Sequence, residues 1–118
     1  MLEEACEVID AIDENDPDAL REELGDLLLQ IAFQSELSRN KGDFDIDRVI
    51  DGICDKLVRR HPHIFSDTKV KNAEQVHQNW ERIKATEKQR MSILDGIPTS
   101  LPALARAQRL GEKSVRVG

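Results

Sequence analysis

The sequence predicts an all-α fold, a helical bundle that is built on an antiparallel helix hairpin and assembles as an oligomer. Apolar residues recur at helical spacing along most of the 118 residues. No segment shows the alternation of polar and apolar residues that is typical of a half-buried strand. One predicted helix is apolar on more than one side, because Leu29 and Phe33 lie off its main apolar face. Such a helix needs several neighbours, which a bundle or an oligomer supplies.

The predicted hairpin consists of two helices on either side of the turn signal Asn15-Asp16-Pro17. Before the turn, apolar residues recur with a 3.6-residue period at Leu2, Ala5, Cys6, Ile9 and Ile12. After it, a second helix to about residue 39 has a core face of Leu20, Leu24, Leu27, Leu28, Ile31 and Leu37. The segment Asn40-Lys41-Gly42 ends this helix.

Three further helices are expected. Asp45 is the N-cap of a third helix, whose apolar stripe consists of Ile46, Val49, Ile50, Ile53 and Leu57. This helix stops at His61-Pro62, and residues 63–71 are expected to form a loop. Asn72 and Gln75 form a start similar to a capping box for a fourth helix to about residue 90. A short fifth helix is expected over residues 101–110.

Composition excludes several partners and compartments. No basic segment followed by an apolar stretch opens the sequence, and no apolar run approaches the roughly 18 residues of a membrane span. Cys6 and Cys54 lie inside helical patterns without metal-type spacing, so we expect reduced core thiols. We therefore expect a cytoplasmic protein without a membrane partner. A nucleic-acid partner is not expected, since the net charge is -6 and no basic stripe is interleaved with aromatic residues.

The charge is unevenly distributed along the chain. Residues 1–53 carry a net charge of -12, whereas residues 54–118 carry +6. A polyphosphate with its metal needs both signs, because carboxylates hold the cation and Lys or Arg side chains hold the phosphate oxygens. Attraction between the two halves explains the same distribution equally well.

Four carboxylates form the most informative pattern. Glu4 and Glu7 are three residues apart, as are Glu23 and Asp26, so each pair shares one helix face. If the chain reverses near residue 15, Glu4 lies level with Asp26 and Glu7 with Glu23. Two like charges about 6 Å apart repel by roughly 3 kcal/mol at an effective dielectric constant of about 20. A solvated helix face explains any single pair better, but two pairs at matched heights favour a divalent cation.

Basic and aromatic residues follow in the second half. Lys56 and Arg60 are four residues apart and share a helix face, whereas Arg59 points elsewhere. Trp80 and Lys84 repeat this spacing. Surface cations and a core Trp are the ordinary alternatives for these residues. His61 and His63 flank Pro62 in a helix-ending loop, and neither a zinc ligand set nor the paired Glu-x-x-His motifs of a di-iron bundle are present.

The ordered set of motifs resembles the MazG family of all-α nucleoside triphosphate pyrophosphohydrolases. The family signature is EExxE followed by ExxD, and the chain has Glu3-Glu4-Ala5-Cys6-Glu7 and Glu23-Leu24-Gly25-Asp26. Further matching segments are Gly25-Asp26-Leu27-Leu28, Asp55-Lys56-Leu57, Arg59-Arg60-His61-Pro62-His63, and Trp80-Glu81 with Lys84. EExxE alone is a weak signal, but the ordered set is specific.

The resemblance implies hydrolysis of nucleoside triphosphates to a nucleoside monophosphate and pyrophosphate, a nucleotide-pool house-cleaning activity that depends on Mg²⁺, with Mn²⁺ as a possible substitute. It implies that the catalytic metal ligands are Glu4, Glu7, Glu23 and Asp26. One carboxylate or the metal would activate water, and we expect Glu7 or Glu4 as the base if a carboxylate does so. Lys56 and Arg60 would then bind the triphosphate, and Trp80 with Lys84 the nucleotide side. The catalytic helical domain would span residues 1–92, followed by a connector and short helix at 93–118.

The same resemblance implies a helix before residue 1, because family members usually carry one ahead of EExxE. We therefore expect the 118-residue chain to self-associate as a homodimer or higher oligomer and to hydrolyse triphosphates poorly. The rival hypothesis is a catalytically weak module that binds nucleotide or only dimerises. The preferred base depends on a few pocket contacts that the sequence does not identify.

Overall fold

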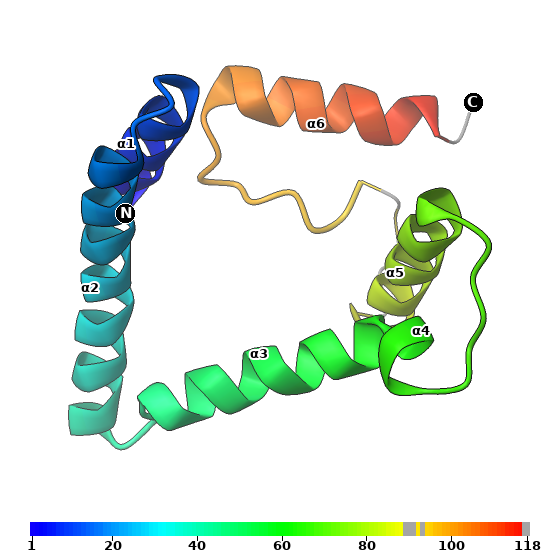
Figure 1. Ribbon diagram of the computed structural model, residues 1–118, viewed down its shortest axis with the longest axis horizontal. Coiled ribbons are helices and arrows are strands. Elements are labelled where there is room, and N and C mark those ends of the chain that lie inside the picture. The colour runs from blue at the N-terminus through cyan, green and yellow to red at the C-terminus, as the bar shows by residue number, and fades with distance from the viewer. Residues whose placement is uncertain (89–91, 93, 117–118) are drawn as a thin grey trace. The chain divides into compact units, whose positions relative to one another are not determined.

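Helices account for most of the chain in the computed structural model, which describes residues 1–88, 92 and 94–116 (Figure 1). No strand occurs among these residues, so the all-α prediction is confirmed. The chain forms two units, Met1–Leu57 and Val58–Gly118, and one helix, α3, runs across their boundary. Each unit is described separately below. The predicted division into residues 1–92 and 93–118 stays a prediction.

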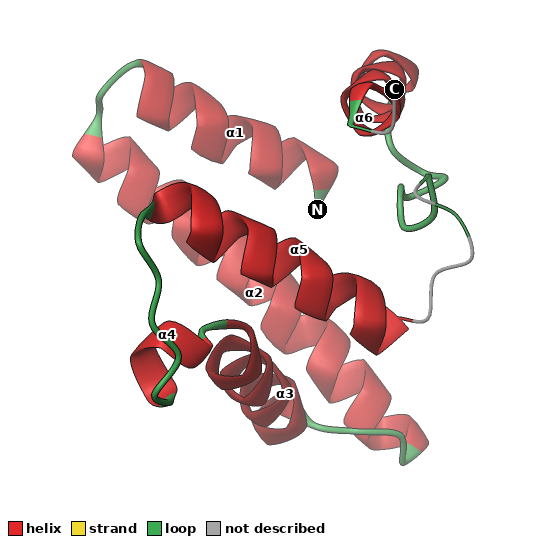
Figure 2. Cartoon of the chain, turned by 90° about the vertical axis from the view of Figure 1, so that its right-hand side faces the viewer, coloured by secondary structure: helices red, strands yellow, loops and turns green. Residues whose placement is uncertain are grey.

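The first unit contains the predicted hairpin, formed by α1 (Leu2–Asp13) and α2 (Pro17–Lys41), which pack against each other (Figure 2). Asn15 adopts a positive φ of 56° in the turn. The Asp16 carboxylate caps α2, because one of its oxygens accepts hydrogen bonds from the backbone N–H groups of Asp18 and Ala19, both at 3.0 Å. Pro17 occupies the first helical position, where its missing N–H costs nothing. The turn signal is therefore confirmed.

Packing between α1 and α2 leaves much apolar surface uncovered. Ala11 is the one buried hydrophobic residue among the described residues. Leu28, Leu29 and Phe33 of α2 are 62%, 61% and 58% exposed. Two helices cover only one stripe of each other, so the remaining apolar positions face outward. Cys6 and Cys54 are free thiols, as expected, but both are exposed, so the prediction that they lie in the core is wrong.

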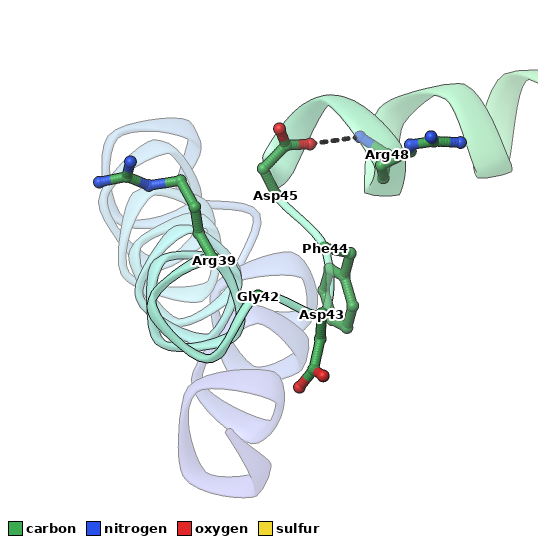
Figure 3. Close-up of a pocket in the computed structure, with 6 residues that line it drawn as sticks. All are labelled: Arg39, Gly42, Asp43, Phe44, Asp45 and Arg48. Carbon is green, nitrogen blue, oxygen red and sulfur yellow. Dashed lines mark hydrogen bonds between the residues drawn. The ribbon is translucent and has the colours of Figure 1, made fainter.

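The third helix, α3 (Ile46–Arg60), begins as predicted. Gly42 ends α2 with a left-handed φ of 81°, a conformation that glycine adopts without strain. Asp45 then accepts a hydrogen bond from the backbone N–H of Arg48 at 3.1 Å (Figure 3). The link between α2 and α3 borders an open, shallow pocket of about 270 Å³ that is lined by Arg39, Gly42, Asp43, Phe44, Asp45 and Arg48.

One loop predicted in the second unit is partly helical. Residues 63–71 were expected to lack helix, but α4 (Pro62–Phe65) is a single helical turn. Pro62 stops α3 and, because its fixed φ suits the first position of a helix, also starts α4. The next helix, α5 (Ala73–Lys88), has the predicted cap: Asn72 accepts from the Gln75 backbone N–H at 2.9 Å. The predicted end of this helix near residue 90 lies outside the described residues.

The last helix, α6 (Ala103–Val115), starts after Pro102 and is longer than the predicted 101–110. Lys113 donates from Nζ to the Asp95 carbonyl at 2.7 Å, which ties the end of α6 to the segment before it. Among the described residues, no helix is both long and apolar enough to cross a membrane.

Candidate functional site

Three of the four predicted carboxylates lie within electrostatic reach of one another on the hairpin. Glu23 is half-buried on α2, whereas Glu7 and Asp26 are exposed. Burial raises the pKa of Glu23, and the negative charges of Glu7, Asp26 and Glu22 raise it further. The hairpin thus brings Glu7 of α1 to the face of α2 that carries the second pair. We call Glu7, Glu23 and Asp26 the acidic face; it contains three of the four carboxylates that the spacing predicted to lie together.

Glu4 is engaged differently from the other three. Its Oε1 accepts a hydrogen bond from Gln30 Nε2 at 3.1 Å, and its Oε2 forms an ion pair with the Met1 ammonium group. The pKa of Glu4 is lowered, chiefly by the hydrogen bond from that ammonium group. Gln30 lies one turn beyond Asp26, the residue expected level with Glu4.

Glu4 meets Gln30 rather than Asp26 because of the direction in which helical side chains lean. Every side chain tilts toward the N-terminus of its own helix. Side chains of α1 therefore lean away from the turn, whereas those of α2 lean toward it. Glu4 consequently meets a residue that lies four positions farther along α2 than simple counting predicts. The reversal of the chain near residue 15 thus sets which residues lie level along the two backbones, but not which side chains meet.

No ready-made metal centre occurs in the part of the chain that the structure describes, since no three His, Cys, Asp or Glu side chains converge to hold an ion there. The donor set nevertheless suits Mg²⁺, which prefers carboxylate oxygens and retains several waters. The Gln30 amide that donates to Glu4 occupies an oxygen that a cation would otherwise use. Metal ligation by Glu4, Glu7, Glu23 and Asp26 stays a prediction.

A second group of functional candidates lies in the unit 58–118 and centres on Arg60. This residue is only 5% exposed. Its Nε and Nη2 both donate to Oε2 of Glu87, at 3.1 and 2.8 Å. Its guanidinium carbon lies 5.2 Å from the centre of the Trp80 ring, a cation–π distance. Trp80 itself is half-buried.

Glu87 is shared by two arginines. Arg59 donates from Nε to Oε1 of Glu87 at 2.6 Å, so each carboxylate oxygen serves one guanidinium group. Hydrogen bonds from Arg59 and then Arg60 lower the pKa of Glu87 to about 2. The prediction that Arg59 points away from the site of Arg60 is therefore wrong. Two consecutive helical side chains converge because the acceptor on α5 lies between their directions.

Two histidines complete this group, which we call the Arg60 cluster: Arg59, Arg60, His61, His63, Trp80 and Glu87. The His61 ring lies edge-to-face with Trp80 at 5.0 Å and with His63 at 5.5 Å between ring centres. His63 Nδ1 is buried and has no hydrogen-bond partner among the described residues. Trp80 therefore contacts both a guanidinium group and an imidazole ring, and its role on the nucleotide side stays a prediction.

The two predicted lysines are less constrained. Lys56 on α3 and Lys84 on α5 are both half-buried. Within the described residues, neither ammonium group forms an ion pair. Both are therefore available to an anionic ligand, and their role in substrate binding stays a prediction.

Glu87 is the residue that sequence reasoning missed. It follows Trp80 by seven positions, which is two helical turns, so both lie on the same face of α5. That spacing was visible in the sequence. Its partner was not, because Arg60 lies 27 residues away along the chain.

Comparison with known proteins gives a consistent result. Residues 1–65 match the MazG nucleotide pyrophosphohydrolase domain. Over 120 residues, the chain is 48% identical to the nucleoside triphosphate pyrophosphohydrolase of Escherichia coli, covering 99% of the chain and 46% of that protein. It is 42% identical over 120 residues to the Thermotoga maritima nucleoside triphosphate pyrophosphohydrolase/pyrophosphatase MazG, covering 100% of the chain and 46% of that protein.

A further relative has no assigned role. The chain is 49% identical over 112 residues to the uncharacterized protein YabN of Bacillus subtilis, covering 93% of the chain but 23% of that protein. The chain thus spans less than half the length of these three relatives. The matched domain contains all four carboxylates together with Lys56 and Arg60, whereas Trp80, Lys84 and Glu87 lie beyond it.

Proposed function

Because this chain belongs to the MazG nucleotide pyrophosphohydrolase family, we propose that it hydrolyses nucleoside triphosphates to a nucleoside monophosphate and pyrophosphate in a reaction that depends on Mg²⁺. The observation that carries the proposal is the acidic face of the hairpin. Glu23 is half-buried beside the charges of Glu7 and Asp26, and no basic group among the described residues pairs with it. Uncompensated like charges of this kind favour the binding of a divalent cation, and Mg²⁺ takes carboxylate oxygens as ligands.

The carboxylates have two proposed roles, metal binding and removal of a proton from water. Glu4, Glu7, Glu23 and Asp26 would hold Mg²⁺, which when bound neutralises phosphate oxygens and lowers the pKa of water. Glu4 is engaged by Gln30, whereas Glu7 forms no hydrogen bond or ion pair within the described residues. Glu7 is therefore the better candidate for the base that removes a proton from the attacking water.

The substrate side draws on basic and aromatic groups. Lys56 and Arg60 would donate to the triphosphate oxygens, and such charge-assisted hydrogen bonds are stronger than neutral ones. Trp80 and Lys84 would contact the nucleotide portion. Positioned cations of this type offset the charge that develops on the departing pyrophosphate. Mn²⁺ would substitute for Mg²⁺, and the cytoplasmic nucleotide pool would supply the substrate.

We also propose that the chain works as a homodimer or higher oligomer. Leu28, Leu29 and Phe33 are more than half exposed, which favours burial against another copy. Light scattering over a dilution series tests this. Phe33→Lys should shift the chain toward monomer, and Leu104→Lys on α6, at a residue that is 88% exposed, is the matched control. Equal behaviour of the two variants would contradict the assignment.

A nucleotide-binding or dimerisation module without turnover is the second candidate. The observation that favours it is the lack of a converged metal-binding group among the described residues. Pyrophosphate release from a panel of canonical and damaged triphosphates, with Mg²⁺ or with a chelator, separates the two functions and identifies the preferred base. Turnover that requires Mg²⁺ supports the enzyme, and nucleotide binding without turnover supports the module.

A further inference from the structure

The Arg60 cluster contains a carboxylate that no proposed catalytic role uses. Both oxygens of Glu87 are occupied, Oε1 by Arg59 and Oε2 by Nε and Nη2 of Arg60. The Glu87 side chain is 20% exposed, and that of Arg60 is 6% exposed. A carboxylate bound on both oxygens has little rotational freedom, so it fixes the direction of the groups that donate to it.

The orientation of Arg60 leaves one edge of its guanidinium group available. Nε and Nη2 donate to Glu87, whereas Nη1 donates to no acceptor within the described residues. Nη1 is therefore the guanidinium nitrogen that is left to donate to a ligand. The planar guanidinium group carries five N–H donors in a fixed fork. Fixing two of its nitrogens therefore also fixes where the third one points.

The same helix supplies both partners of Arg60. Trp80 and Glu87 are seven residues apart on α5, a rise of about 10.5 Å along one face. Arg60 lies against the Trp80 ring while its other side reaches Glu87. Glu87 therefore determines how the guanidinium group is seated on the ring, and all three residues belong to the unit 58–118.

We propose that Glu87 is a positioning residue that holds Arg60 against Trp80 and turns its Nη1 edge toward the triphosphate of the substrate. This inference rests on the proposed function, because it takes Arg60 and Trp80 as substrate-binding residues. Glu87 itself does not touch substrate. A merely structural tether between α3 and α5 is the alternative, and it predicts lost stability without any specific loss of phosphate binding.

The test uses the full 118-residue chain, in which Trp80 is the single Trp and reports on its own surroundings. Glu87→Gln keeps the shape of the side chain but removes its charge. Glu112→Gln is the matched control, since Glu112 accepts from Arg109 at 2.7 Å on α6 and lies outside the cluster. Without ligand, Glu87→Gln should change the Trp80 emission spectrum and Glu112→Gln should not.

Ligand binding provides the second measurement, with inorganic tripolyphosphate and a nucleoside as the probes, both in Mg²⁺. Glu87→Gln should weaken tripolyphosphate binding about tenfold, since a misdirected charge-assisted hydrogen bond loses most of its free energy. Nucleoside binding should change less than twofold. With a nucleoside triphosphate substrate, KM should rise more than kcat falls.

The outcomes distinguish the inference from the function on which it rests. If the parent chain binds tripolyphosphate and Glu87→Gln binds it equally well, the positioning role is overturned but the proposed function is not. If the parent chain binds no tripolyphosphate, both are overturned. If Glu87→Gln does not fold, Arg59→Ala replaces it, because it releases Oε1 of Glu87 and so lets the carboxylate turn and shift Arg60. Arg59→Ala should weaken tripolyphosphate binding about threefold, and unchanged binding would overturn the inference.

Discussion

The acidic face of the hairpin and the Arg60 cluster use charge in opposite ways. Glu7, Glu23 and Asp26 bring like charges together, and the pKa of Glu23 rises in consequence. In the cluster, the carboxylate of Glu87 meets two guanidinium groups and its pKa falls to about 2. The first arrangement has no compensating positive charge among the described residues, whereas in the second the carboxylate is already paired with two arginines of the chain. A carboxylate cluster without a positively charged partner in the chain is therefore a better candidate for metal binding than a carboxylate that is already paired with arginines.

The largest expected effect tests the acidic face directly. Glu7→Gln and Asp26→Asn should each reduce pyrophosphate release by at least about a hundredfold, a loss of roughly 3 kcal/mol in transition-state stabilisation. Both should also blunt the rise in melting temperature that Mg²⁺ produces by binding the folded state. Asp10→Asn, on an exposed part of α1, is the control. A metal response shared equally by all three variants would show that the site is misplaced.

The next effect compares two cations of α3 that are expected to bind phosphate. Lys56→Ala and Arg60→Ala should each weaken triphosphate binding about tenfold, the order of one charge-assisted hydrogen bond. Only Arg60→Ala should also lower the melting temperature markedly, because it leaves Glu87 without the donor at 2.8 Å. Calorimetry with thermal unfolding measures both effects. Loss of stability without loss of affinity in Arg60→Ala would make Arg60 a structural residue.

A smaller effect concerns the pH dependence of the acidic face. The folded-state pKa of Glu23 is raised above its unfolded value, so its charged form destabilises the fold and stability is regained as pH falls through that pKa. Without metal, Glu23→Gln should therefore raise the melting temperature at pH 7, and the gain should shrink as acid neutralises Glu23. Thermal unfolding between pH 4 and 8 checks this. A lower melting temperature for Glu23→Gln at pH 7 would contradict the proposed repulsion.

The smallest expected effect concerns the pH dependence of the Arg60 cluster, where the pKa shift has the opposite direction. The folded-state pKa of Glu87 is depressed from 4.5 to about 2, so its stabilisation is complete above pH 4.5 and is lost as pH falls toward 2. The difference in melting temperature between the parent chain and Glu87→Gln should be constant from pH 5 to 8 and narrow only below about 4.5. A difference that instead changes near neutral pH would point to another titrating group.

Local elements of the fold followed from the sequence because their causes lie within a few residues. Asp16, Asp45 and Asn72 each cap a helix by accepting from a backbone N–H two or three positions farther on. Gly42 ended α2 for an equally local reason. The spacing of the carboxylates likewise predicted an acidic face on the hairpin. Residues 63–65 were misjudged because a proline that ends one helix also starts the next.

What only the tertiary structure decided is the partner of each side chain. Glu4 meets Gln30 across 26 residues, and Arg59 and Arg60 meet Glu87 across 28 and 27. Such pairings depend on helix packing and on the lean of side chains, neither of which a periodic pattern contains. The sequence by itself predicted each described helix except the single turn α4, and it also carried the family signature. Packing decided that Arg60 is buried and already paired, while Glu23 is half-buried among like charges.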